Sequence, residues 1–260
     1  MDTPWEANLP ASDLGALEDL GLEPVGIALG TCVIKRGAMY SQRPTYGGFG
    51  QSFSPWANGN DPYSQSWQSA LGRLVAEAKA KGGHGIIGCT TDFTFIGEGM
   101  TIEVMLRGTV VRAAGRPPSE IPFTTKADAR QIMKLLAAGL APRQLVFGYS
   151  YLNVSNYFTS YQMQSWANSE VTSLSQGATK CREFAINNML TEAMRTGSHE
   201  VVDAKVGSHI YEYEANGQVY FNFTASAIGS GVWKCGERFF DMRPLTMLRL
   251  RDNVDLDVLE

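Results

Sequence analysis

The 260-residue sequence predicts an α+β fold in which one β-α-β-β unit, preceded by a short helix, occurs twice in tandem. The prediction depends on two internal alignments and on the order of the elements around them. Residues 21–34 align with residues 139–152 at an offset of 118 through a shared Gly-Leu-x-Pro. Residues 81–89 (KGGHGIIGC) and 196–204 (TGSHEVVDA) share a Gly-x-His-x frame that is followed by two β-branched apolar residues.

Each unit is expected to begin with a short helix that leads into a strand. Apolar-periodic stretches at 13–20 and 129–138 are each followed by a glycine, Gly21 or Gly139, and by a proline three residues later. A glycine just past the last turn and a nearby proline are typical helix stop signals. The aligned residues that follow, with their β-branched and apolar content, predict the first strand of each unit.

A longer helix follows in each unit. Its apolar residues recur at the 3.6-residue period of one helix face. In the first unit they are Trp67, Leu71, Leu74, Val75 and Ala78, and in the second Ile186, Met189, Leu190 and Ala193 fill the last four places at an offset of 115. Gly82 and Gly197 are expected to end these helices, two residues before His84 and His199.

A two-stranded hairpin closes each unit, and its last strands are predicted at 103–111 and 220–228. An offset of 117 keeps Val104 and Leu106 on the same face as Phe221 and Phe223. An offset of 118 would exchange the core and solvent faces of the strand. We therefore expect the second hairpin to be two residues longer, a small cost in loop entropy.

The overall composition indicates a cytoplasmic globular protein. Apolar residues make up 44% and charged residues 18% of the chain, and the net charge is -4. This balance offers no basic patch for nucleic acid or for an anionic membrane, so neither is expected as a partner. The N-terminus does not resemble a signal peptide, and no stretch of 18 apolar residues occurs. The four cysteines are far apart and are interpreted as reduced thiols.

The glycine and apolar motifs of both units resemble those of YbjQ-like proteins, a family often labelled as heavy-metal-binding. The resemblance is carried by GLEPVGIALGTCV, EAKAKGGHGIIGC and a closing RGTVV in the first unit, and more weakly by the second. It implies two-layer domains with antiparallel sheets, rings that are pentameric, and no established biochemical activity. The chain would then comprise a first repeat at 12–115, a second at 116–232, and an extra strand or clasp at 233–260.

A transition-metal site, for Zn or Cu, is the alternative that the histidines raise. The candidate ligands are His84, His199 and Cys89, although single-domain relatives usually carry an acidic or small residue where the histidines stand. His84 and Cys89 are five positions apart, which places them on opposite faces of a regular strand. The preferred interpretation is structural, with each ring capping free carbonyls at a helix C-terminus. A metal or small-ligand site would then require histidines gathered where subunits meet.

No residue is assigned a catalytic role, and the protein is predicted not to be an enzyme. The sequence contains no G-x-S-x-G, P-loop or dinucleotide-binding motif, and no Cys–His pair with a third member. No cofactor is therefore expected.

The long connections between first strand and helix are rich in aromatic residues. Loops of this length are usually functional or disordered, and the aromatic content argues against disorder. Either these segments fold over their own core, or they form an interface with another copy or another protein. The candidate interface residues are Tyr46, Phe49, Phe53, Trp56, Tyr63, Tyr157, Tyr161 and Trp166. The predicted function is a non-enzymatic homo-oligomer, a pentamer-like ring with a structural or partner-docking role.

Overall fold

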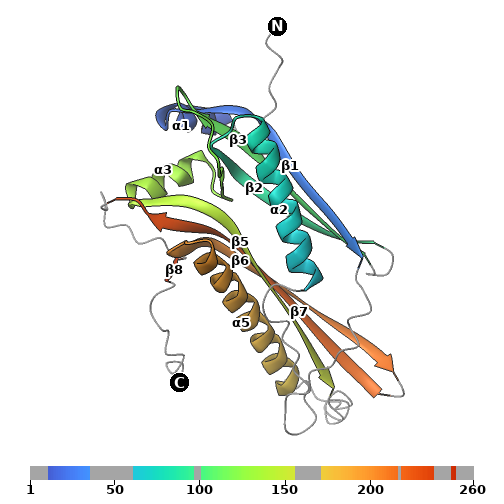
Figure 1. Ribbon diagram of the computed structural model, residues 1–260. Coiled ribbons are helices and arrows are strands. Elements are labelled where there is room, and N and C mark those ends of the chain that lie inside the picture. Colours follow the sequence, from blue (N-terminus) through green and yellow to red (C-terminus); the bar gives the residue numbers. More distant parts are fainter. Residues whose placement is uncertain are drawn as a thin grey trace.

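A computed structural model describes residues 11–35, 61–96, 101–155, 171–215, 218–236 and 247–249. The first repeat contains α1 (Ala11–Asp19), β1 (Leu22–Lys35), α2 (Pro62–Ala80), β2 (Gly85–Ile96) and β3 (Thr101–Ala113). The second repeat contains α3 (Ala129–Ala137), β5 (Leu140–Ser155), α5 (Thr172–Arg195), β6 (Glu200–Ala215) and β7 (Gln218–Lys234). The predicted fold class, two tandem β-α-β-β units each preceded by a short helix, is confirmed (Figure 1).

Each repeat forms one four-stranded sheet. The first sheet has the order β1-β3-β2-β4, where β4 (Phe123–Thr124) is a short strand parallel to β2. The second sheet has the order β5-β7-β6-β8, and β8 (Met247–Arg249) is antiparallel to β6. The other strand pairs are antiparallel. After each repeat the chain therefore returns to add a short strand beside the start of that repeat's second strand.

The glycines expected to stop the helices do so. Gly21, Gly82, Gly139 and Gly197 all have φ between 65° and 74°, a left-handed conformation that few other residues adopt at low cost. At its start, α2 is capped by the side chain of Asp61, which accepts the Ser64 N–H at 2.8 Å. The ends of all four helices and the beginning of α2 are thus encoded locally.

Each long helix lies directly on its own sheet, and a glycine in the first strand allows the close approach. A Cβ at Gly30 would collide with the backbone of Ala70 and Leu74 in α2. A Cβ at Gly148 would collide in the same way with Ala185 and with Met189 in α5. The paired glycines of the sequence alignment are therefore helix contact points, where only hydrogen fits.

The prediction of which face of the closing strands is buried is confirmed, whereas the predicted difference in length between the two hairpins is wrong. Val104, Leu106, Phe221 and Phe223 are all buried under the helices, as the strand alternation predicts. The pairings of Gly85 with Val111, and of its counterpart Glu200 with Val232, give an offset of 121 for β3 and β7. Because β2 and β6 correspond at an offset of 115, the second hairpin is about six residues longer, not two.

The two repeats pack on each other through an aromatic cluster. Trp67 in α2 stacks on Phe147 in β5 with ring centroids 4.8 Å apart, and Phe93 in β2 lies 5.6 Å from Phe147. Beside them, Tyr63 stacks on Tyr149 at 3.8 Å. The second sheet thus has α5 on one face and the α2–β2 side of the first repeat on the other (Figure 1). The resulting order of layers is first sheet, α2, second sheet, α5.

The linker between the repeats is bonded to both sheets. Its β4 segment pairs with β2, while the hydroxyl of Thr124 accepts the Leu145 N–H of β5 at 2.8 Å. The Ser230 hydroxyl in β7 accepts from the Thr125 hydroxyl at 3.1 Å and from the Lys126 N–H at 2.9 Å. These largely buried hydrogen bonds fix the relative position of the repeats, because breaking one would leave a desolvated polar group.

Candidate assembly surfaces

The outer face of the first sheet exposes apolar side chains along β1. Leu29 is 50% exposed and Val33 is 56% exposed, and both point away from α2 because their neighbours Ala28, Gly30 and Cys32 point toward it. On the second sheet the aligned position to Leu29 is Phe147, which is only 5% exposed because it packs on the first repeat. We name this surface the outer β1 face (Ile27, Leu29, Thr31 and Val33).

A second apolar surface lies on β6 beside α5. Val206 is 42% exposed and Ile210 is 52% exposed. Their cross-strand partners on β7 are Ala227 and Phe223, which are buried under α5, so all four side chains lie on the α5 side of the sheet. Between them, Ser208 accepts a hydrogen bond from Nε of Arg182 at 3.1 Å. We name this surface the α5–β6 side (Arg182, Val206, Ser208 and Ile210). In the first repeat, the equivalent surface is the α2–β2 side, which packs on β5.

The free edge of β1 is blocked by side chains of α2. Glu77 accepts the Leu29 N–H at 2.7 Å, while Lys81 donates to the Ile27 carbonyl and Arg73 to the Thr31 carbonyl. In the second repeat, Asn188 donates to the Tyr149 carbonyl of β5 at 2.8 Å. Such capping prevents an edge strand from pairing with another chain. An assembly of this protein would therefore use the faces of the sheets at these positions.

Most of the predicted aromatic interface residues lie outside the described residues. These are Tyr46, Phe49, Phe53, Trp56, Tyr157, Tyr161 and Trp166. Tyr63 is described, and it belongs to the first turns of α2, where it is buried against Tyr149. The structure therefore places Tyr63 at the interface between the two repeats of one chain. Its helical spacing from Trp67 and Leu71 was the available signal for that position.

His84 and His199 occupy equivalent positions and accept equivalent hydrogen bonds. Nδ1 of His84 accepts the Ala113 N–H, and Nδ1 of His199 accepts the Lys234 N–H, each at 3.2 Å. In His84 the other ring nitrogen, Nε2, also lies 2.6 Å from the Pro117 carbonyl, so the ring donates there while its Nδ1 accepts. The rings thus tie the helix-to-strand turn to the end of the closing strand, rather than capping helix carbonyls.

Replacing His84 by alanine is expected to lower the free energy of unfolding by about 1–2 kcal/mol, because two hydrogen bonds are lost. Urea denaturation measures the change, and His209→Ala, at an exposed position on β6, is the control, expected within about 0.5 kcal/mol of the wild type. Loss of a bound metal from the His84→Ala protein, with its unfolding unchanged, would contradict the structural role.

Cys89 is buried in the core of the first repeat. Its side chain packs in the same apolar cluster as Trp67 and Leu74, while the His84 ring is bonded to the loop at 113–117. Burial raises the pKa of Cys89 to about 12, against a weaker opposing effect of the hydrogen bond with the Thr125 backbone. A metal ligand must be a thiolate, so this position disfavours the chemistry. Within the described residues, no three His, Cys, Asp or Glu side chains are grouped to hold a metal ion.

Cys89 is expected to resist alkylation in the folded protein. The raised pKa lowers the thiolate fraction by about a thousandfold at neutral pH, and burial restricts access further. Peptide mass spectrometry after brief iodoacetamide treatment should show the exposed Cys235 modified and Cys89 intact. Rapid modification of Cys89 under native conditions would contradict the buried position, and urea-unfolded protein provides the fully reactive control.

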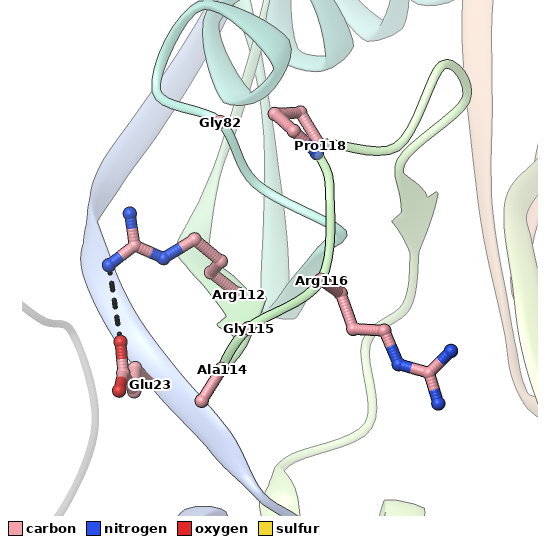
Figure 2. A pocket seen from close by; sticks show the side chains of 7 residues that line it. All are labelled: Glu23, Gly82, Arg112, Ala114, Gly115, Arg116 and Pro118. Carbon is pink, nitrogen blue, oxygen red and sulfur yellow. Dashed lines mark hydrogen bonds and ion pairs between the residues drawn. The ribbon is translucent and has the colours of Figure 1, made fainter.

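A pocket of about 420 Å³ lies beside the loop that His84 holds (Figure 2). Arg112 on its wall pairs with Glu23 at 3.2 Å. Figure 2 shows the Arg116 side chain pointing away from that pair, so the two guanidinium groups do not converge on one point. The remaining lining is small or apolar: Gly82, Ala114, Gly115 and Pro118. The pocket therefore brings together neither a nucleophile and base nor two cations around a common anion position.

None of the helices in the part of the chain that the structure describes is long and apolar enough to cross a lipid bilayer. No protein-family model matches the sequence. The chain is similar to an encapsulin nanocompartment protein of Mycobacterium tuberculosis, with 28% identity over 205 residues that cover 76% of each chain. Because neither repeat alone is that long, the similarity extends across both repeats. The resemblance to YbjQ-like proteins stays a prediction.

Proposed function

We propose that the protein is a non-enzymatic, self-assembling protein of the cytoplasm that forms a closed, pentamer-like ring with a structural or partner-docking role. The observation that carries this proposal is the similarity to a nanocompartment protein over three quarters of both chains. A nanocompartment is an assembly, and because the similarity extends across both repeats, self-assembly is the property that we propose for this chain. The proposal includes membership of the YbjQ-like group, with repeats at 12–115 and 116–232 and an extra strand or clasp at 233–260.

The exposed apolar faces support self-assembly. Leu29, Val33, Val206 and Ile210 are large apolar residues with roughly half of their surface exposed, and they lie in pairs on two sheet faces. Contiguous apolar patches on a folded protein are typical of interaction sites. Since the edge of β1 is already capped by α2, we propose that these two faces provide the contact area.

A structural rather than an enzymatic role is supported by the polar groups of the described residues. His84 and His199 accept hydrogen bonds from backbone N–H groups, and Cys89 is a buried thiol. In the open pocket, the side chain of Arg116 points away from that of Arg112. These groups are used for the fold, and they do not form the mutually oriented pair that acid–base or nucleophilic catalysis requires.

Light scattering on tag-free protein, combined with negative-stain electron microscopy, tests the proposed function. We expect a discrete species of several chains and closed particles of uniform size at micromolar concentration. A single species of one 28.4 kDa chain would contradict the proposal.

The aromatic segment between β1 and α2 is proposed to contribute to the assembly or to a docked partner. Deleting residues 40–58 removes Tyr46, Phe49, Phe53 and Trp56 but keeps Asp61, the N-cap of α2. The shortened protein is expected to retain its circular dichroism spectrum and to form smaller oligomers in light scattering. An unchanged oligomer that also binds the same partners as the wild type would remove this segment from the interface.

A further inference from the structure

We infer that copies of the chain assemble head to tail, with the outer β1 face of one copy packed on the α5–β6 side of the next. The inference rests on the proposed self-assembly and adds which two surfaces meet. Its basis is the contact between the two repeats inside one chain, which shows how one repeat of this fold packs on another.

We call the contact between the two repeats of one chain the inner contact, and one side of it is a sheet face. Leu145, Phe147 and Tyr149 of β5 are at most 5% exposed, because they lie against the first repeat. At the alignment offset of 118 their counterparts on β1 are Ile27, Leu29 and Thr31. Both strands carry the same irregularity, after Pro24 and after Pro142, so the alignment holds in the structure. The outer β1 face is therefore the equivalent sheet face, and on it Leu29 and Val33 remain about half exposed in the part of the chain that the structure describes.

The other side of the inner contact is formed by one side of helix α2 and by the neighbouring strand β2. Trp67 of α2 and Phe93 of β2 together receive the Phe147 ring. At the offset of 115 their counterparts are Arg182 of α5 and Ser208 of β6, which are joined by a hydrogen bond. Val206 and Ile210 flank Ser208 on the same face and remain about half exposed. The α5–β6 side is thus the equivalent receiving surface.

The two surfaces lie at opposite ends of the stack of layers, as Figure 1 shows: the first sheet begins the stack and α5 ends it. One chain cannot bring them together, whereas a second copy can, by repeating the relation that already joins the two repeats. A contact between different surfaces of identical chains is heterologous, and it closes into a ring when the repeated rotation closes. This geometry agrees with the ring that we propose.

The replacement of Trp67 and Phe93 by Arg182 and Ser208 suits a surface that is exposed before assembly. The inner contact forms once, during folding, and can be fully apolar. The outer contact must remain soluble in the free chain, and arginine is a residue enriched in interfaces between separately folded proteins. We therefore expect the contact between copies to be the more dissociable of the two.

Site-directed cross-linking tests the inference. Two variants, Leu29→Cys and Ser208→Cys, are made separately in a Cys235→Ser background, because Cys235 is the exposed one of the four native cysteines while Cys32, Cys89 and Cys181 are buried. A short bis-maleimide is preferred to direct disulfide formation, because a disulfide requires the two Cβ atoms to lie only about 3.5–4.5 Å apart. A cross-linked dimer is expected when the two variants are co-assembled, and not from either alone.

A second pair of variants measures the contact without new cysteines. Leu29→Glu is expected to weaken assembly by about tenfold or more, because it places a charge at the centre of the contact. Leu136→Glu, on α3 and 37% exposed, is the matched control and is expected to leave assembly unchanged. Both positions are exposed in the single chain, so both variants should fold.

The outcomes separate the inference from the proposed function. Cross-linking of Leu29→Cys with itself would show a twofold contact and overturn the head-to-tail arrangement. An intact oligomer without cross-links, unaffected by Leu29→Glu, would also overturn it while leaving self-assembly in place. A monomer in every experiment would overturn both.

Discussion

Replacing Gly148 by alanine is expected to lower the free energy of unfolding by about 3 kcal/mol, measured by urea denaturation. The added Cβ would collide with the backbone of Ala185 and Met189 in α5, and a helix backbone cannot give way as a flexible side chain can. Overpacking in a core costs about 1–3 kcal/mol, and a backbone clash belongs at the upper end. Gly30→Ala should behave alike, because its Cβ would meet Ala70 and Leu74 of α2.

Gly207→Ala is the matched control for this pair. A Cβ at Gly207 would have its nearest neighbour, the Ser226 hydroxyl, at 3.6 Å, an ordinary van der Waals contact. Its stability is expected within about 0.5 kcal/mol of the wild type. If Gly148→Ala were as stable as Gly207→Ala, α5 would not lie on β5 as closely as described.

Replacing Trp67 by alanine is expected to cost about 3–5 kcal/mol, the range for removal of a fully buried tryptophan. Trp67 is 2% exposed and joins α2 to Phe147 of the second repeat. The loss should therefore fall on the contact between repeats as well as on the first core. We expect calorimetry to show two separate transitions where the wild type shows one.

Trp233→Ala is the control for tryptophan removal. Trp233 lies near the end of β7 and is 40% exposed, so its removal should cost about 1 kcal/mol or less. A single transition with unchanged midpoint in Trp67→Ala would mean that the repeats are not coupled through the aromatic cluster.

The order of elements and the faces of the strands could be predicted because they depend on local signals. Glycines at 21, 82, 139 and 197 mark helix ends by backbone conformation, and alternation along β3 and β7 marks the buried face. The difference in hairpin length could not be predicted in the same way. Offsets of 117 and 121 have the same parity, so both put the same side chains in the core.

The packing of one repeat on the other was also beyond the sequence patterns. Tyr63 and Trp67 were expected in a loop interface and in a helix core, respectively, yet both contact β5 of the other repeat. A helical period shows which residues are apolar, but it does not tell which of two sheets each one meets. Similarly, the repeated Gly-x-His motif predicted an equivalent turn in both repeats. The hydrogen bonds of His84 and His199 to the closing strands could not be predicted, because they depend on how distant strands pair.

Native mass spectrometry of tag-free protein, purified without chelator, tests self-assembly most directly. The account predicts a discrete multiple of the 28.4 kDa chain that carries no metal mass. A bare monomer at the concentrations used for the other experiments would contradict it, and the outer β1 face and the α5–β6 side would then have no second copy to cover them.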